Sequence, residues 1–174
     1  GVDVVIIHKA NVGKGKLTNS LAATYSKTYK IGATKGSDIL TDAGLLDTYF
    51  DESSRVYLEL AVPRVKANLT NNYETGKWNF FLRNAFFGGV EDTGTLTGGG
   101  HPEIGSVVVT DLSIGYNLSD VLKLTVGANN LLDIYPDELP NYLTSSNQFV
   151  YSRRVSQFGN NGRYVFGRLS FKLK

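Results

Sequence analysis

Apolar and small polar side chains alternate along most of this chain. The alternation predicts seven strands, at residues 2–12, 16–32, 62–74, 77–90, 106–117, 121–131 and 163–173. In 106–117, for example, one face carries Leu112 and Ile114, whereas the other carries Asp111 and Ser113. A period of two over eight or more residues is typical of a strand whose two faces meet different surroundings.

The connections between these strands alternate in length. Short polar turns lie at Gly13-Lys14-Gly15, Thr75-Gly76 and Ser119-Asp120, and the long connections span 33–61, 91–105 and 132–162. This alternation predicts an all-β, antiparallel up-and-down meander, with short turns at one end of the strands and long connections at the other end. Outer-membrane β-barrels have this form.

The polar face of the predicted sheet separates two architectures. That face carries small polar or charged side chains, and the members from the second and third strands are Thr18, Ser20, Thr24, Ser26, Lys66, Asn68, Thr70 and Asn72. An apolar outside and a hydrophilic inside fit part of a large transmembrane barrel. The alternative is a soluble ligand-binding β-barrel or β-sandwich whose apolar face covers a core. Alternation alone does not separate them.

The aromatic residues favour the membrane interpretation. If the tight turns mark one end of the strands, four aromatic residues lie near that end on the apolar face, namely Tyr73, Trp78, Tyr116 and Phe171. A second group, Tyr25, Tyr29 and Phe86, lies towards the long connections. Two aromatic belts around an aliphatic band are typical of membrane barrels.

The long connections contain local signals of their own. Ser37 or Asp38 is placed to cap a short helix. The segment RVYLELAVPRV alternates again, so the third strand is expected to begin as early as Arg55, with a bulge or break at Pro63 because proline cannot donate to a ladder. The segment 91–105 is rich in turn residues and is expected to be mobile.

Composition narrows the function classes. The chain has no cysteine, which excludes a disulfide scaffold and a thiolate site, and its net charge is +2 without a Lys/Arg block, so nucleic acid is not an expected partner. Apolar runs fall short of the roughly 18 residues of a membrane-spanning helix. A barrel in the outer membrane also needs a signal peptide, which we expect to lie outside this chain.

Candidate chemical motifs are few. His8 and His101 have no matched carboxylate spacing, so no metal site is expected. The segment VGKGKLT lacks phosphate-loop spacing and is predicted to be a hairpin turn. The loop carboxylates, which are Asp38, Asp42, Asp47, Asp51, Glu52, Glu91 and Asp92, suggest no acid–base pair and are expected to be solvated. We therefore predict no catalytic residue, no cofactor and no enzyme activity.

Three segments carry a family resemblance. The segment VTDLSIGYNLSDVLKLTVGANNLLDIYPDELP resembles the penultimate hairpin of TonB-dependent outer-membrane receptors, with Asn129-Asn130-Leu131 and Asp133–Pro136 as its most specific elements. The tail FGNNGRYVFGRLSFKLK is similar to their closing strand, although these barrels usually finish on an aromatic residue and Phe171 is the nearest equivalent here. The segment PRVKANLTNNYETGKWNFFLRNAFFGGV is similar to an earlier hairpin in receptors of the Bacteroidetes type.

The resemblance implies a fragment. A family barrel has about 22 strands around a plugged lumen, so residues 1–174 are expected to be its C-terminal segment, without the plug and the earlier strands. The whole protein would import an iron chelate, a vitamin or a glycan across the bacterial outer membrane, with outer-membrane lipid, the TonB system and that small molecule as partners. Lumen-facing Arg83, Asp111 and Arg168 are expected to be structural. The isolated segment is expected to self-associate through its open strand edges.

Overall fold

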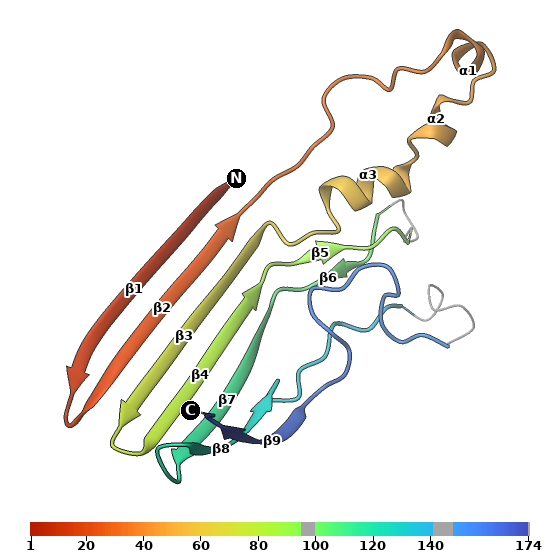
Figure 1. The fold of residues 1–174 in the computed structure, drawn as a ribbon. Coiled ribbons are helices and arrows are strands. Elements are labelled where there is room, and N and C mark those ends of the chain that lie inside the picture. The colour runs from red at the N-terminus through yellow and green to blue at the C-terminus, as the bar shows by residue number, and fades with distance from the viewer. Residues whose placement is uncertain (95–99, 141–147, 174) are drawn as a thin grey trace.

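The computed structural model describes residues 1–94, 100–140 and 148–173. One antiparallel sheet contains seven strands in chain order (Figure 1), namely β1 (Val2–Val12), β2 (Gly15–Tyr25), β3 (Val65–Thr75), β4 (Trp78–Phe87), β7 (Val107–Asn117), β8 (Leu122–Asn129) and β9 (Tyr164–Phe171). A two-stranded sheet, β5 (Val90–Glu91) and β6 (Glu103–Ile104), extends β4 and β7. The predicted meander and all seven of its strands are therefore confirmed.

The two ends of the strands differ as predicted. Tight turns join β1 to β2, β3 to β4 and β7 to β8 at one end, and the long connections leave the other end (Figure 1). Gly13 and Gly76 lie in two of the tight turns with φ of +58° and +54°. Glycine adopts this left-handed conformation without a steric penalty. The segment VGKGKLT is thus a hairpin turn.

Strand β2 is shorter than predicted, because it ends at Tyr25 and not at residue 32. Its partner β3 begins at Val65, which lies opposite Tyr25. The backbone N–H of Ser26 still donates to the carbonyl of Arg64 at 2.8 Å, but the residue before that is Pro63, which has no N–H to continue the ladder. The predicted break at Pro63 is correct, and it ends both strands. Tyr29 therefore lies beyond the sheet and outside the predicted aromatic belt.

The prediction that the third strand begins as early as Arg55 is wrong. Residues Glu52–Glu59 form the helix α3, although their sequence alternates. The carboxylate of Asp51 accepts a hydrogen bond from the N–H of Ser54 at 2.7 Å and caps the helix. Arg55 then pairs with Glu52 and Glu59, three and four residues away, which only a helix brings together.

The connection between β2 and β3 holds two more helices, α1 (Asp38–Asp42) and α2 (Leu46–Tyr49). Ser37 caps α1 by accepting from the N–H of Leu40, as one of the two predicted capping residues. No helix among the described residues is long and apolar enough to cross a membrane.

The register confirms two chemically different faces. Ser20 lies opposite Thr70 on one face, which we call the polar face. Leu82 lies opposite Leu112 on the other, which we call the apolar face. The apolar face continues to the last strand, where Leu124 of β8 lies opposite Leu169 of β9.

The apolar face is not covered by a core. Val126 and Leu169 each keep 52% of their surface exposed, which a soluble sandwich would bury. The buried hydrophobic residues of the described chain are few and mostly lie near the long connections; they are Val56, Ala85, Val90, Ile104, Ala128 and Val155. The soluble alternative therefore lacks the packed interior that it requires.

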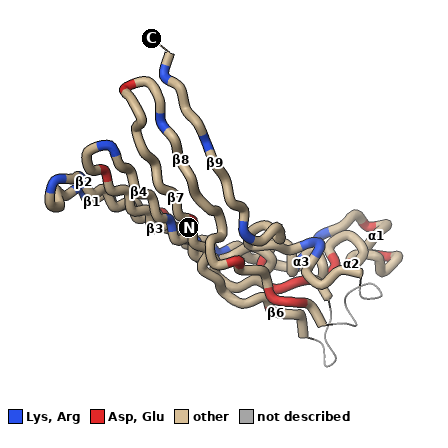
Figure 2. The backbone as a smooth tube through the Cα atoms, turned by 90° about the horizontal axis from the view of Figure 1, so that it is seen from below, with Lys and Arg blue, Asp and Glu red and all other residues tan. Residues whose placement is uncertain are grey.

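One aromatic belt is plainly present on the apolar face. The ring centroid of Trp78 lies 4.6 Å from that of Tyr116 and 6.1 Å from that of Phe80, which in turn lies 6.3 Å from Tyr73. Phe80 joins these predicted members because it lies opposite Tyr73 across the β3–β4 hairpin. The sheet that carries the belt is bent, since β7, β8 and β9 turn away from the plane of β1 and β2 (Figure 2).

Two glycines on neighbouring strands, Gly127 of β8 and Gly167 of β9, give a matched test of how closely each strand packs against its surroundings. A Cβ on Gly127 would lie 2.6 Å from the Cβ of Ser113 and 2.7 Å from the carbonyl of Leu112, whereas a Cβ on Gly167 would have no neighbour within 4 Å. We expect Gly127→Ala to lower the free energy of unfolding by about 1–3 kcal/mol. Gly167→Ala is expected to change it by less than about 0.5 kcal/mol. Urea unfolding of the full-length protein measures both, and equal effects would contradict this packing.

Candidate functional site: the long-connection surface

The three long connections gather beyond one end of the strands (Figure 1); they are 33–61, 91–105 and 132–162. Within the described residues they are joined to one another by side-chain hydrogen bonds. We call the described parts of these three connections the loop surface. Residues 95–99, on which part of the predicted mobile segment falls, lie outside the described residues.

Helix α3 is tied to its surroundings through Arg55. The guanidinium donates to Glu52 through Nε at 2.8 Å and pairs with Glu59 at 3.1 Å. Glu59 also accepts from the backbone N–H of Lys30 at 2.8 Å, which fastens the start of the first connection to the helix. The hydrogen bond from Arg55, followed by that from His101, lowers the pKa of Glu52 to about 2.

His101 joins the first and second connections. Its Nε2 lies 3.0 Å from Oε1 of Glu52, and its Nδ1 lies 3.2 Å from the carbonyl of Gly94. The other histidine, His8, lies on the apolar face of β1. Among residues 1–94, 100–140 and 148–173, no three metal-ligating side chains gather into one site.

The third connection is joined to the second by two part-buried hydrogen bonds. The guanidinium of Arg154 donates to the hydroxyl of Thr93 at 2.9 Å. The amide nitrogen of Gln157 donates to the carbonyls of Gly88 and Gly105, at 2.6 and 2.8 Å, and so bridges the ends of β4 and β7. Among the described residues its Oε1 is a buried oxygen that accepts no hydrogen bond.

The expectation that the loop carboxylates are solvated fails for Asp92. Its side chain is buried, and Oδ1 accepts from the N–H of Thr93 at 2.6 Å. Glu52 and Asp51 are engaged in the ion pairs and helix cap described above. Spacing along the chain did not reveal these roles, because each partner comes from a local turn or a distant connection.

The Asn130 and Asp133 elements of the predicted signature form a locked turn after β8. Both residues have left-handed backbones, with φ of +49° and +59°. The Asn130 amide accepts from the N–H of Ile134 at 2.9 Å and donates to its carbonyl at 2.7 Å. Asp133 accepts from the N–H of Arg163 at 2.7 Å, which brings the return of the chain to the start of β9.

Asp111 anchors that turn to the sheet. Its Oδ1 accepts from the N–H of Asn130 at 2.8 Å, and its Oδ2 accepts from Nε of Arg83 at 2.7 Å. Asp111 is buried, whereas Arg83 lies opposite it in the register and is half-exposed on the polar face. The predicted structural role of this pair therefore has a geometric basis. Arg168 does not join it, and instead lies over the ring of Phe166 at 5.7 Å.

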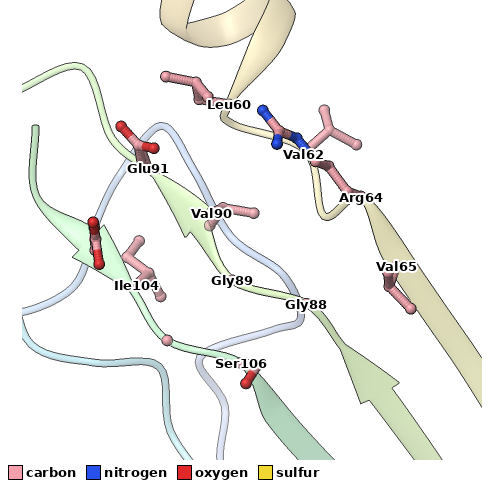
Figure 3. Close-up of a pocket in the computed structure, with 12 residues that line it drawn as sticks. Leu60, Val62, Arg64, Val65, Gly88, Gly89, Val90, Glu91, Ile104 and Ser106 are labelled. Atoms are coloured by element: carbon pink, nitrogen blue, oxygen red, sulfur yellow. The ribbon is translucent and has the colours of Figure 1, made fainter. Parts of the chain in front are cut away.

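Two hollows open near the loop surface. The larger, of about 460 Å³, lies between the start of β3 and the strands β4–β5 and β6–β7 (Figure 3). Its apolar lining residues are Leu60, Val62, Val65, Val90 and Ile104, and Arg64 lies at its wall. This mixture is mainly apolar, and the hollow separates the helices from the sheet.

The smaller hollow, of about 210 Å³, has a different chemistry. Its side chains include Asp92, Leu139, Phe149, Tyr151, Arg153 and Arg154. The guanidinium of Arg153 lies 4.7 Å from the ring of Phe149, and Tyr151 stacks on Tyr135 at 5.9 Å. Two guanidinium groups beside aromatic rings are suited to an anionic, flat ligand. This cluster could not be recognised from the sequence, because Asp92 and Arg154 are distant along the chain.

Comparison with known proteins finds one matching family and several solved structures with a similar fold. A family model described as TonB dependent receptor-like, beta-barrel matches residues 7–131. No curated protein matches the chain. The fold is similar to that of a ferric enterobactin receptor mutant from Pseudomonas aeruginosa solved with enterobactin, at 14% identity and a TM-score of 0.53, over 97% of this chain and 21% of that one.

A second solved structure is similar to the same degree. It is the siderophore receptor PirA from Acinetobacter baumannii, at 18% identity and a TM-score of 0.50, over 95% of this chain and 21% of that one. At these identities the likeness shows the fold alone. The chain thus spans about a fifth of the length of the solved structures that it matches.

The anchor at Asp111 yields a testable prediction. Asp111→Ala leaves the buried N–H of Asn130 without its acceptor, so we expect the free energy of unfolding to fall by about 1–3 kcal/mol. Asp111→Asn is the control, because its amide oxygen still accepts that bond. Urea unfolding of the full-length protein, with limited proteolysis at the turn after β8, measures both. The anchor is wrong if alanine and asparagine behave alike and neither exposes the turn.

Proposed function

Because the chain belongs to the TonB-dependent receptor β-barrel family, whose model matches residues 7–131, we propose that it is the C-terminal segment of a receptor that imports a scarce nutrient. It is a bacterial outer-membrane protein. Members of this family are transporters rather than enzymes, and we propose that this protein catalyses no reaction. The narrower likeness to receptors of the Bacteroidetes type stays a prediction.

One observation carries the proposal, namely the exposed apolar face of the seven-stranded sheet. Large apolar side chains on it, such as Val126 and Leu169, keep about half of their surface exposed. Strands β1, β2, β3, β4 and β7 have ten or eleven residues, which matches the roughly 9–11 residues that a tilted strand needs to cross a bilayer, whereas β8 and β9 have eight. We infer that this face meets acyl chains and that the polar face lines the lumen.

The orientation of the sheet in the membrane follows from the lengths of its connections. Outer-membrane barrels have short turns towards the periplasm and long loops towards the outside. We therefore propose that the loop surface faces the medium and receives the ligand. Energy would arrive from the TonB system through a plug that precedes this segment, since the chain spans only about a fifth of the structures it matches.

The open edges of the sheet fit the same proposal. The outer edges of β1 and β9 have no strand beside them in the described sheet. Unpaired backbone groups are not tolerated in the hydrocarbon region, so further strands of the barrel must complete both edges. The lumen-facing Val5 and Ile7 of β1 are 67% and 62% exposed and would be covered by the plug. Isolated from these parts, the segment would self-associate through its edges.

For the ligand we propose an anionic iron chelate in preference to a neutral glycan or a vitamin. The support is the smaller hollow, where Arg153 and Arg154 lie beside Phe149 and Tyr151. Guanidinium groups pair with anionic oxygen atoms, and aromatic rings stack on flat ligand groups.

Uptake of a ferric catecholate by cells producing the full-length receptor tests this. We expect uptake to require TonB, and the double variant Arg153→Gln with Arg154→Gln to weaken chelate binding by at least about tenfold, because each charge-assisted hydrogen bond contributes about 1.5–3 kcal/mol. Arg64→Gln is the control, since it removes one positive charge at the larger hollow. Uptake of a neutral oligosaccharide in place of the chelate would overturn the ligand assignment, and TonB-independent uptake would overturn the function.

A further inference from the structure

A row of polar side chains crosses the apolar face of the first three strands. His8 of β1 lies opposite Asn19 of β2, which lies opposite Asn71 of β3. The Asn71 amide nitrogen donates to Oδ1 of Asn19 at 2.7 Å, and the Asn19 amide nitrogen lies 3.3 Å from Nδ1 of His8. We call these three residues the polar row. Its position is unexpected, because the neighbours on the same face are apolar; they include Ile6, Leu21 and Leu69.

The polar row lies near the middle of the membrane-crossing strands. His8, Asn19 and Asn71 are each one residue from the centre of an eleven-residue strand. Headgroups and interfacial water contact the ends of such strands, so they do not reach this row. Polar groups in the hydrocarbon region are costly and are normally paired with protein.

The internal hydrogen bonds do not use all the capacity of the row. Because Oδ1 of Asn19 accepts from Asn71, the Asn19 amide nitrogen is the donor to Nδ1 of His8, and Nε2 of His8 then carries the proton. Nε2 of His8 and one N–H on each asparagine remain as donors. The oxygen atoms of Asn19 and Asn71 remain as acceptors. The row therefore offers both donors and acceptors to whatever faces it.

Missing parts of the barrel cannot supply a partner for Asn19 and Asn71. A further strand beside β1 would place a side chain next to His8, but both asparagines already lie between paired strands. The plug would lie against the opposite, polar face. The partner must therefore approach from the lipid side.

We propose that the polar row is the centre of an interface with a second copy of the same receptor. In a two-fold interface the same surface occurs on both sides, so a surface that carries matching donors and acceptors can satisfy itself. Asn19, the middle residue, keeps one donor and one acceptor and would lie near the two-fold axis against Asn19 of the second copy. The proposal rests on the lipid-facing assignment made under Proposed function.

Disulfide crosslinking of the full-length receptor in outer membranes tests this interface, using a background without other cysteines. Leu21→Cys places a thiol on the apolar face, two residues from Asn19 on the same strand. Val126→Cys is the matched control on the same face of β8, away from the polar row. We expect oxidation to give a receptor dimer from Leu21→Cys and not from Val126→Cys. Adding Asn19→Leu and Asn71→Leu should reduce that dimer at least tenfold, while the barrel stays heat-modifiable on gels.

Three results would overturn the interface: no dimer from Leu21→Cys, the same yield from both cysteines, or a dimer that survives both leucine substitutions. A crosslink from Leu21→Cys to a different protein would also overturn the second copy as partner. Labelling of Val126→Cys by a membrane-impermeant maleimide reports separately on the lipid-facing assignment. If that label reacts, the proposed function fails; if only the dimer is missing, the interface alone fails.

Discussion

The unbroken hydrogen-bond ladder from β1 to β9 is the constraint on which the rest of the structure depends. Every strand pairs with its neighbours in register, so the backbone between the outer edges of β1 and β9 satisfies its own polar groups and leaves only side chains to face outward. A hydrocarbon solvent tolerates such a surface only if those side chains are apolar, which is what Leu82 and Leu112 supply in the middle of the sheet. The few buried hydrophobic residues are consistent with this, because a membrane wall needs no core between two sheets. The same logic makes the polar row on β1–β3 a feature that needs a partner.

Sequence alternation predicted the seven strands, their order and both faces, because period two is imposed by the sheet itself. It failed where a local device overrides the pattern. Residues 55–59 alternate, but the cap at Asp51 and the pairs of Arg55 make them a helix. The end of β2 depends on Pro63, a residue that directly precedes the partner strand β3 and lies far from β2 along the chain. Composition of one segment carries no information about such a partner.

The site was less predictable than the fold. The Asn130 and Asp133 signature was visible in the sequence, and its left-handed backbones and bonds to Ile134 explain why those residue types are present. The hollow beside Arg154 was not visible, since Asp92 and Arg154 come from different connections. Likewise the burial of Asp92 depends on the third connection folding back over the second. These contacts are set by long-range chain return, which periodicity does not encode.

The sheet and the loop surface have distinct physical roles. The sheet is rigid and its chemistry is repetitive, whereas the loop surface concentrates the ion pairs, aromatic stacks and buried polar groups. Locked junctions join the two, with Asp111 holding the turn after β8 and Gln157 bridging β4 and β7. A receptor needs this division, because recognition outside the membrane must be held at a fixed position relative to the wall.

Under the proposed function, neighbouring residues of one strand face lipid and lumen in turn. Leu112 and Ser113 of β7 are adjacent and lie on opposite faces. Thiol labelling of Leu112→Cys and Ser113→Cys in the full-length receptor, in outer membranes, compares membrane-permeant with impermeant maleimides. We expect Leu112→Cys to react only with the permeant reagent and Ser113→Cys to react with the impermeant one as well. Reaction of Leu112→Cys with the impermeant reagent, or shielding of Leu112→Cys from both, would contradict it.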